Sequence, residues 1–257
     1  MADDHLTLPT SLSPEALKKQ LEKWQPWRIQ VDFSNGVSTR DFARQDPFND
    51  CPLFKFKVVE RIIPFAKMAG KKLLDIGSNV GHNSIHAAIK YHLACTGIDL
   101  VPRHLEISRF FAELTHVPIE FLEGNAETFS RPGEFDVILH FGTLYHLPNP
   151  LLSLQTSFGN LRPGGYLALE TQVFDHPEDS NLCYFMHRQN NDRTNFWALS
   201  PSVLFTILAF YGFTSITELA RFGPIEGLAP NMKRIILTAR KPTPSFKEKV
   251  RQALHSR

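Results

Sequence analysis

The stretch Leu73–Gly81, with the sequence LLDIGSNVG, decides the fold class. It begins as a short apolar strand, turns at Gly77 and enters a helical segment that carries Ile85 and Ile89 on one face. Glycine at position 77 leaves no Cβ to keep a ligand from the backbone, and Gly81 allows the helix to pack close to the sheet. The pattern therefore predicts a strand, a tight turn and a helix, with a flat or polar ligand over the turn.

The glycine spacing separates two kinds of nucleotide site. Dinucleotide-binding proteins carry G-x-G-x-x-G, so that the pyrophosphate can lie at the helix N-terminus. Here the spacing is G-x-x-x-G, with Asn79 inside the turn. This disfavours a dehydrogenase, and a tight connection without any ligand stays open as the structural alternative.

Around this stretch, short apolar runs alternate with amphipathic helical segments, which predicts βαβ units and a parallel sheet. Five strands are predicted first, over residues 73–76, 94–99, 119–122, 135–140 and 166–170. Ser200 and Pro201 then predict a helix that ends at Gly212. Two closing strands are predicted over 214–219 and 234–239.

The residues before the sheet predict a small cap. Ser13 and Pro14 indicate a helix start, residues 25–50 show turns such as Asp46-Pro47, and a helix is predicted from Leu53 to Ala69. We therefore expect an N-terminal cap over residues 1–52, a main domain over 53–242 with a polar, lid-like insertion over 172–199, and a tail over 243–257.

Composition excludes some classes of protein and leaves others open. The 257 residues carry 28 Lys and Arg against 26 Asp and Glu, a balance that neither requires nor forbids nucleic acid. Three widely spaced cysteines fit neither a disulfide framework nor a zinc site, so we expect no metal and a reducing compartment. The first residues are acidic, unlike a signal peptide, and the most apolar run, 203–213, is too short to span about 30 Å of hydrocarbon. The expected location is cytoplasmic, without a membrane partner.

Two polar segments follow the second and third predicted strands. Asp99 ends the second strand, where a carboxylate can accept hydrogen bonds from ribose hydroxyls; its alternative role is to cap the helix that begins near Pro102. The loop over 123–127 follows the third strand, where a short loop commonly contacts an adenine edge. Glu127 could equally be a solvated acid in the first turn of a helix.

The strongest candidate for chemistry follows the fourth strand. Tyr145 and His146 lie in a loop at the carboxyl edge of the sheet, where open α/β folds place reactive groups. Glu170 ends the fifth strand and could contact a substrate. His140 is expected to be a core histidine, and a structural role stays open for Tyr145 and His146.

Together these motifs resemble class I S-adenosylmethionine-dependent methyltransferases over residues 53–242. Three segments, 142–150, 169–171 and 233–242, are similar to the carboxymethyltransferases that complete 5-oxyacetate on the wobble uridine of tRNA. The resemblance implies a Rossmann-like α/β fold with a mostly parallel, seven-stranded sheet that ends in an antiparallel hairpin. It also implies S-adenosylmethionine, or its carboxylated analogue, as cofactor.

The chemistry of methyl transfer and the resemblance together indicate which residues serve the site. Our hypothesis for catalysis is that Tyr145 orients the transferring group and that His146 or Glu170 helps to remove or place a hydroxyl proton. Trp27 and Trp197 are expected to form apolar walls over the substrate. The cofactor-binding residues implied are Lys55, Asp75, Gly77, Gly81, Asp99, Asn125, Ala126, Glu127, Phe141, Tyr145 and Arg234.

One position departs from the carboxymethyltransferase pattern. After Trp27-Arg28 that family carries a lysine for the cofactor carboxylate, and this chain has Ile29. Losing such a charge-assisted hydrogen bond costs about 1.5–3 kcal/mol, so we expect ordinary methyl transfer to an oxygen or nitrogen of a small molecule.

Two alternatives stay open, transfer to tRNA and a cofactor-binding partner protein without turnover, and so does a homo-oligomer. Binding of tRNA would need a basic face, and the residues available for it are Arg28, Arg40, Arg44, Lys55, Lys57, Arg188, Arg193, Lys247, Lys249 and Arg251.

Overall fold

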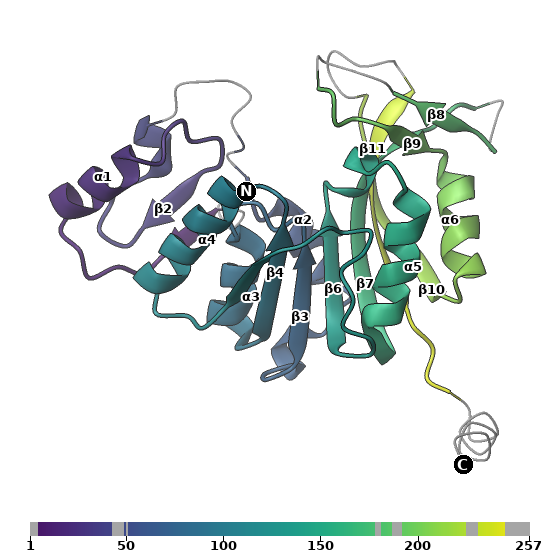
Figure 1. The fold of residues 1–257 in the computed structure, drawn as a ribbon, viewed down its shortest axis with the longest axis horizontal. Coiled ribbons are helices and arrows are strands. Elements are labelled where there is room, and N and C mark those ends of the chain that lie inside the picture. Colours follow the sequence, from purple (N-terminus) through teal and green to yellow (C-terminus); the bar gives the residue numbers. More distant parts are fainter. Residues whose placement is uncertain are drawn as a thin grey trace. The chain divides into compact units, whose positions relative to one another are not determined.

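The computed structural model describes residues 5–42, 49, 51–177, 181–186, 192–224 and 231–244 (Figure 1). The chain divides into two compact units, Met1–Asn125 and Ala126–Arg257. Each unit is an assembly of strands and helices with its own apolar interior.

The first unit contains two consecutive βαβ steps. Strands β3 (Lys72–Ile76), β4 (Ala94–Asp99) and β5 (Glu120–Glu123) are parallel neighbours in that order. They are connected by α3 (His82–Tyr91) and α4 (Pro102–Leu114). The strands predicted over 73–76, 94–99 and 119–122 are therefore confirmed to within one residue. The prediction succeeds because residues that favour turns flank each apolar run.

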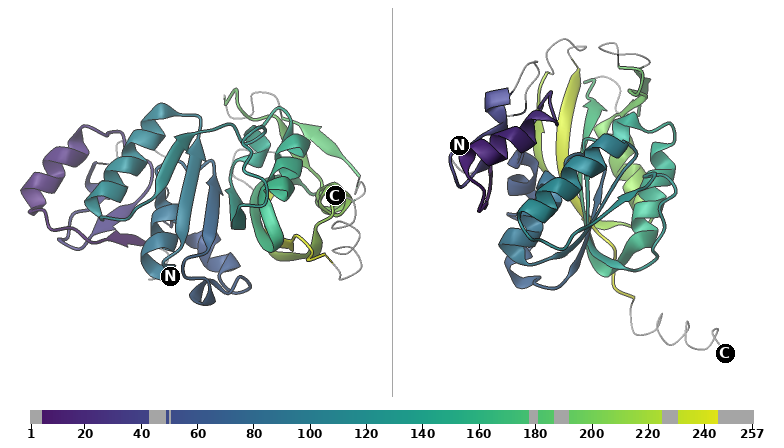
Figure 2. Two further views of the ribbon diagram at one scale, coloured as in Figure 1. Left: turned by 60° about the horizontal axis from the view of Figure 1, so that its bottom comes forward. Right: turned by 60° about the vertical axis from the view of Figure 1, so that its left-hand side comes forward.

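The N-terminal segment packs on α4. It forms β1 (Leu6–Leu8), α1 (Pro14–Glu22), β2 (Val31–Phe33) and the 3₁₀ turn η1 (Thr39–Phe42), and Figure 2 shows α1 beside α4. The Ser13 hydroxyl accepts a hydrogen bond from the amide of Ala16, which confirms the predicted helix start. The predicted Asp46-Pro47 turn lies outside the described residues.

Trp27 belongs to this buried cluster, so its expected role as a wall over the substrate is wrong. Its ring is 2% exposed and stacks on Phe111 with 5.6 Å between centroids. The indole N–H donates to the carbonyl of Leu21 at 3.2 Å, which satisfies the only polar group of the ring. In a segment rich in turns, the sequence does not indicate whether a tryptophan ring faces the protein interior or a ligand.

The helix predicted from Leu53 to Ala69 is shorter in the structure. Helix α2 covers Phe54–Val59, and a separate 3₁₀ turn, η2, covers Phe65–Lys67. Pro64 lies between them. Proline has no N–H and disfavours a helical conformation in the residue before it, so the helix does not continue through this position. The apolar periodicity of the sequence does continue, which is why the predicted helix is too long.

Gly81 fits the close approach expected of it. Its φ is +76°, and a Cβ built there would lie 2.6 Å from Cζ of Phe121 on β5. Gly77 also has a positive φ, +68°. The turn therefore depends on glycine at both ends, at Gly77 for conformation and at Gly81 for conformation and space.

Gly81→Ala should lower the free energy of unfolding by about 2–3 kcal/mol, because it combines a strained φ with overpacking against Phe121. Gly70→Ala is the matched control: its φ is +74° but nothing lies within 4 Å of an added Cβ. It should cost only the conformational part, about 1 kcal/mol. Urea unfolding of the two variants measures the difference, and equal losses would contradict the packing argument.

In the second unit, neighbouring strands follow the order β10, β11, β7, β6, and the short strands β8 and β9 lie off this path. Strand β6 (Phe135–Phe141) is parallel to β7 (Leu161–Phe174), whereas β11 (Met232–Arg240) is antiparallel to both β7 and β10 (Thr214–Phe222). With β3, β4 and β5 these make the seven predicted strands, including the closing hairpin. The helices are α5 (Pro150–Asn160) and α6 (Pro201–Phe210).

The segment 172–199, expected to be a polar loop, contains regular structure. Residues 172–174 continue β7, and β8 (Cys183–Phe185) pairs antiparallel with β9 (Trp197–Leu199). Strands of three residues are too short for periodicity to reveal. The structure does not describe 178–180 and 187–191, and the lid role stays a prediction.

Two further observations concern the described residues as a whole. None of their helices is both long and apolar enough to span a bilayer. No disulfide bond joins any of the three cysteines, Cys51, Cys95 and Cys183.

Candidate functional site

In the first unit, the Asp99 carboxylate is held against the Gly77–Gly81 turn. Its Oδ2 accepts from the amide of Asn79 at 2.9 Å, and its Oδ1 accepts from the amide of Val101 at 2.9 Å. Asp99 therefore braces the turn and accepts from the amide of the residue before α4. The N-cap of α4 is Val101 and no side chain caps the helix, so the capping alternative is wrong. The ribose role stays a prediction.

The ionised form of Asp99 is favoured by its surroundings. His104 Nδ1 lies 3.2 Å from Oδ1 of Asp99. Burial alone would raise the pKa of Asp99, but the hydrogen bonds from His104 and the two amides lower it below its ordinary value. The strand end thus presents a carboxylate that stays charged at neutral pH.

Asp75, at the C-terminal end of β3, lies in a different environment. It is 1% exposed and its Oδ2 accepts from the Ser84 hydroxyl at 2.8 Å. Burial raises the pKa of Asp75 to about 7, and the charge of Asp99 adds to the increase. The cofactor role of Asp75 stays a prediction. Its hydrogen bond connects β3 to α3 within the strand-turn-helix motif.

Two further predicted residues of this unit lie near the same strand ends. The amide of Gly124 donates to the carbonyl of Asp99 at 3.1 Å, which brings the loop that carries Asn125 beside the end of β4. Burial lowers the pKa of His82 at the start of α3 to about 3, and the charge of Lys55 contributes to the decrease, so Lys55 lies close to this helix end. The first unit thus gathers Lys55, Asp75, Gly77, Gly81, Asp99 and Asn125.

In the second unit, Tyr145, Glu170 and Arg234 form one cluster. Nη1 of Arg234 donates to Oε1 of Glu170 at 2.6 Å, and Nη2 donates to the Tyr145 hydroxyl at 3.1 Å. The guanidinium carbon lies 5.3 Å from the centroid of the Tyr145 ring. Burial alone would lower the pKa of Arg234, but Glu170 and Tyr145 raise it, so this side chain stays charged.

The backbone around Tyr145 is fixed by neighbouring strands. Phe141 is opposite Glu170 in the β6–β7 register, and the amide of Gly142 donates to the carbonyl of Glu170 at 3.0 Å. The amide of Phe196, just before β9, donates to the carbonyl of Tyr145 at 2.9 Å. The 3₁₀ turn η3 (Leu144–His146) is therefore held by β7 and by the segment that leads into β9.

His146 has a chain of partners that the sequence did not predict. Its Nδ1 lies 2.9 Å from the Thr194 hydroxyl oxygen, which is 2.6 Å from Oδ1 of Asp192. The His146 and Tyr145 rings lie 4.1 Å apart. Partial burial would raise the pKa of Asp192, but bonds from Thr194 and the charge of His146 lower it. A carboxylate in this position can orient the imidazole and stabilise its protonated form.

Glu127 is neither solvated nor in the first turn of a helix. Its Oε1 accepts from the amide of Asn149 at 2.7 Å, and its Oε2 accepts from the Asn149 side chain at 3.2 Å. Asn149 is the residue just before α5, so the carboxylate lies at that helix N-terminus. Ala126 is buried beside it in the chain. Cofactor contacts of both residues stay predictions.

Sequence reasoning missed the partners of the predicted residues. Ser84, His104, Asn149 and Thr194 each bind a predicted site residue, and Asp192 binds Thr194. The pair His146 and Thr194 is 48 residues apart, and no spacing rule connects them. His140 is confirmed as a core histidine, fully buried and 2.9 Å from the Ser153 hydroxyl. In the described part of the chain, no cluster of His, Cys, Asp or Glu is arranged to hold a metal ion.

These features define an α/β protein of the nucleotide-binding type, with an acid at the end of the second strand of its βαβ motif and a tyrosine-arginine-carboxylate cluster. The chain belongs to the methyltransferase-domain family, whose model matches residues 52–219. The predicted family is thereby confirmed.

Relatives with assigned names fall into two groups. The chain is 32% identical to a tRNA U34 carboxymethyltransferase of Syntrophotalea carbinolica over 181 residues, which cover 68% of this chain and 52% of the relative. It is also 32% identical over 108 residues to a ubiquinone biosynthesis O-methyltransferase of Pseudomonas aeruginosa, covering 41% of this chain and 46% of that protein. The chain thus spans about half the length of the curated relatives it matches.

Solved structures share the fold at low sequence identity. The N-terminal domain of EvdMO1, crystallised with S-adenosylhomocysteine and D-fucose, matches with a TM-score of 0.68 at 18% identity, covering 90% of this chain and 97% of that one. The [4+2]-cyclase SpnF matches with a TM-score of 0.59 at 20% identity, covering 74% and 80%. The class I methyltransferase fold is confirmed, and the cyclase illustrates that the fold alone does not fix the reaction.

Proposed function

We propose that this chain is an S-adenosylmethionine-dependent methyltransferase that acts on an oxygen or nitrogen nucleophile of a small molecule. Family membership supports the reaction class. The observation that carries the cofactor assignment is the Asp99 carboxylate at the end of β4, hydrogen-bonded to the Gly77–Gly81 turn. A ribose beside this turn would meet a charged acceptor.

The residues present fit such a nucleoside. A carboxylate offers about four acceptor positions, and the contacts of Asp99 with Asn79, Val101 and His104 use three. One ribose hydroxyl can therefore bind without breaking the turn. Gly77, with its positive φ and no side chain, keeps the backbone accessible. Bound there, S-adenosylmethionine would supply an electrophilic methyl group.

The second unit supports a division of labour among the three predicted catalytic residues. Glu170 has no exposed surface and is ion-paired with Arg234, which disfavours it as a proton acceptor. His146 is half-buried and linked through Thr194 to Asp192, so it is the better general base. In this proposal Tyr145 orients the reacting group, His146 accepts the proton of the nucleophile, and Glu170 with Arg234 positions Tyr145.

Tyr145→Phe should lower kcat by about tenfold or more and leave cofactor affinity nearly unchanged, because it removes a hydroxyl that Arg234 holds by a charged hydrogen bond. Release of S-adenosylhomocysteine with a panel of phenols and amines measures turnover, and calorimetry measures affinity. An unchanged rate would remove Tyr145 from the mechanism. Tyr166→Phe, which also removes a phenol but from β7 outside the cluster, is the control.

Two observations favour the methyl donor over its carboxylated analogue. The positive charge of Arg234 is already paired with Glu170, so a cofactor carboxylate would have to compete for it. Ile29, at the position where the carboxymethyltransferases carry a lysine, is 9% exposed in the N-terminal hydrophobic cluster. Residue 29 of this chain is therefore an apolar side chain that offers no charge to a cofactor carboxylate.

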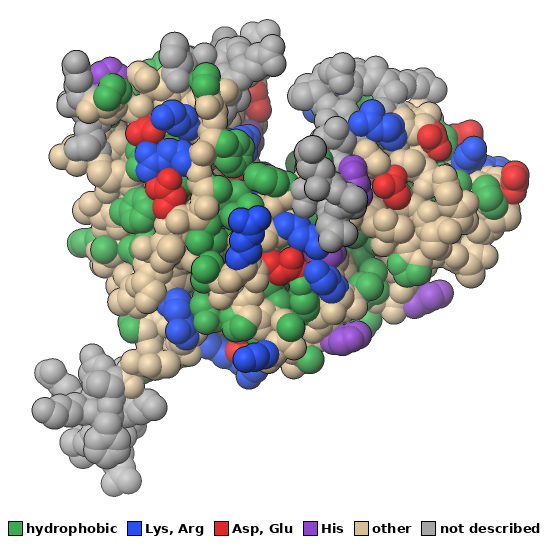
Figure 3. Space-filling view, turned by 180° about the vertical axis from the view of Figure 1, so that it is seen from behind, with side chains coloured by type: hydrophobic (Ala, Val, Ile, Leu, Met, Phe, Trp, Pro, Cys, Tyr) green, Lys and Arg blue, Asp and Glu red, His purple; other side chains and the backbone are tan. Residues whose placement is uncertain are grey.

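Transfer to tRNA is the second candidate, favoured by the named activity of the relatives. Figure 3 shows Lys and Arg side chains mixed with acidic and hydrophobic ones on the face it displays, which gives this candidate little support. Arg44, Arg188, Lys247, Lys249 and Arg251 lie outside the described residues. A steep fall of tRNA affinity with salt would favour tRNA transfer, and no binding at low salt would exclude it.

Mass spectrometry of the nucleoside that co-purifies with the protein tests the main proposal. S-adenosylmethionine or S-adenosylhomocysteine is expected. The carboxylated analogue would instead favour carboxymethyl transfer. If neither co-purifies and calorimetry detects no binding of S-adenosylhomocysteine, the proposal fails. Binding without transfer to any acceptor would favour a non-catalytic partner protein. A cytoplasmic location stays a prediction, supported by three cysteines that form no disulfide bond.

A further inference from the structure

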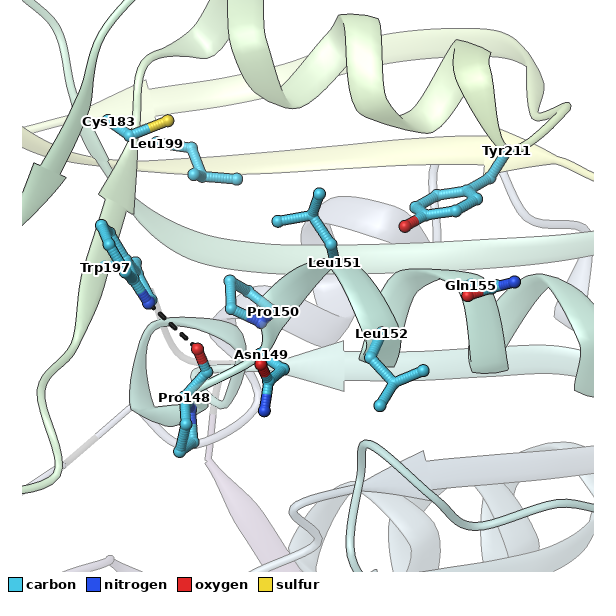
Figure 4. Close-up of a pocket in the computed structure, with 10 residues that line it drawn as sticks. All are labelled: Pro148, Asn149, Pro150, Leu151, Leu152, Gln155, Cys183, Trp197, Leu199 and Tyr211. Atoms are coloured by element: carbon cyan, nitrogen blue, oxygen red, sulfur yellow. Dashed lines mark hydrogen bonds between the residues drawn. The ribbon is translucent and has the colours of Figure 1, made fainter.

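The second unit contains a cavity that is lined by Trp197 but not by Tyr145, His146 or Glu170. The expected role of Trp197 as a wall over the substrate stays a prediction. The cavity has a volume of about 640 Å³, within the range of about 300–1,000 Å³ that is typical of small-molecule sites. It lies among the start of α5, strands β8 and β9 and the residue after α6 (Figure 4). Its lining residues are Pro148, Asn149, Pro150, Leu151, Leu152, Gln155, Cys183, Trp197, Leu199 and Tyr211.

The lining determines which chemistry the cavity can accept. Among the described residues that line it there is no Asp, Glu, Lys, Arg or His, so they offer no charged partner to a phosphate, a carboxylate or an ammonium group. Figure 4 shows Trp197 at one end and the Tyr211 hydroxyl with the Gln155 amide toward the other. Such a lining suits a neutral, elongated molecule with an apolar body and one hydroxyl or carbonyl end.

The cavity is distinct from the Tyr145 cluster. Side chains alternate across a strand, and in β9 Ala198 packs in the buried cluster of Tyr145, whereas Trp197 and Leu199 line the cavity. One strand therefore separates the two. The walls are also fixed, because the indole N–H of Trp197 donates to the carbonyl of Pro148 at 3.1 Å.

We propose that this cavity is an accessory binding site for a neutral, mainly apolar small molecule. A protein partner is the weaker candidate, because a stable interface needs about 20–30 residues a side and the cavity has ten. Leu151 and Leu152, 47% and 40% exposed, place apolar surface at its edge that a small ligand would cover.

Titration of the full chain with N-phenyl-1-naphthylamine, a neutral fluorescent apolar probe, tests the proposal. We expect saturable binding of one probe per chain. Leu151→Arg, at an exposed position, should weaken binding at least tenfold by placing a charge in the cavity. Ile62→Arg is the matched control: Ile62 is 48% exposed, as Leu151 is at 47%, but belongs to the first unit and does not line the cavity, so its replacement should leave binding unchanged.

Three results would overturn the proposal. The first is the absence of saturable binding in the wild-type chain, and the second is equal loss of binding in both variants. The third is sedimentation showing a dimer that Leu151→Arg dissociates while the probe does not bind, which would identify a second copy as the occupant. Circular dichroism of Leu151→Arg would check that this variant is folded. The result is independent of the co-purified nucleoside, so the two proposals can fail separately.

Discussion

Arg234→Met should lower the free energy of unfolding by about 3–5 kcal/mol. The guanidinium of Arg234 is 2.6 Å from a carboxylate of Glu170 that has no exposed surface. Methionine matches the length of the apolar stem but removes the charge, so Glu170 would have to stay ionised without it or take up a proton. Both outcomes are costly, because the carboxylate cannot reach water from its place in β7.

The matched double variant separates charge burial from lost packing. Glu170→Gln combined with Arg234→Met removes both charges and should recover at least half of the loss, since an amide is less costly to bury than a carboxylate. Urea unfolding of wild type, both single variants and the double variant completes the cycle. If Arg234→Met costs less than 1 kcal/mol, or if the double variant is no better, the ion pair does not stabilise this unit as described.

Asp75→Asn should stabilise the protein at pH 8 by up to about 4 kcal/mol and leave it nearly unchanged at pH 4. Burial raises the pKa of Asp75 to about 7, well above its unfolded value of 3.8. Between these pH values the folded state holds a proton that the unfolded state has released, so the contribution of Asp75 to stability falls as pH rises. Over about three pH units this amounts to roughly 4 kcal/mol.

The comparison requires a carboxylate that stays in water. Asp41→Asn is the control, because Asp41 is exposed in η1. Urea unfolding at intervals from pH 4 to pH 8 gives the difference between each variant and the wild type. The difference for Asp75→Asn should grow with pH up to about pH 7. The difference for Asp41→Asn is subtracted as the effect of the same change at an exposed position. A constant difference for Asp75→Asn would mean that this carboxyl titrates normally.

The parts of the fold that sequence predicts well are those set by local signals. Apolar runs bounded by turns gave β3, β4 and β6 nearly to the residue, and Ser200 with Pro201 marked the start of α6. The failures involve competition between signals. Pro64 interrupts a helix that periodicity alone would continue, and β8 and β9 gain their pairing from partners distant in sequence.

The candidate site shows the same limit. A glycine turn followed by an acid at a strand end is a local pattern, so Gly77 and Asp99 could be named from sequence. Arg234 is predicted from the family resemblance, because no spacing rule points to it. Its pairing with Glu170 depends on the antiparallel register of β7 and β11, which no short-range signal determines.

The burial of Trp27 has a practical consequence. Of the three tryptophans, Trp24 and Trp27 belong to the first unit and Trp197 to the second. Trp197→Phe would leave an intrinsic emission signal that comes from the first unit only, while Trp24→Phe with Trp27→Phe would leave one from the second. Stopped-flow records of the two proteins would then reveal whether the halves of the chain fold together or in succession.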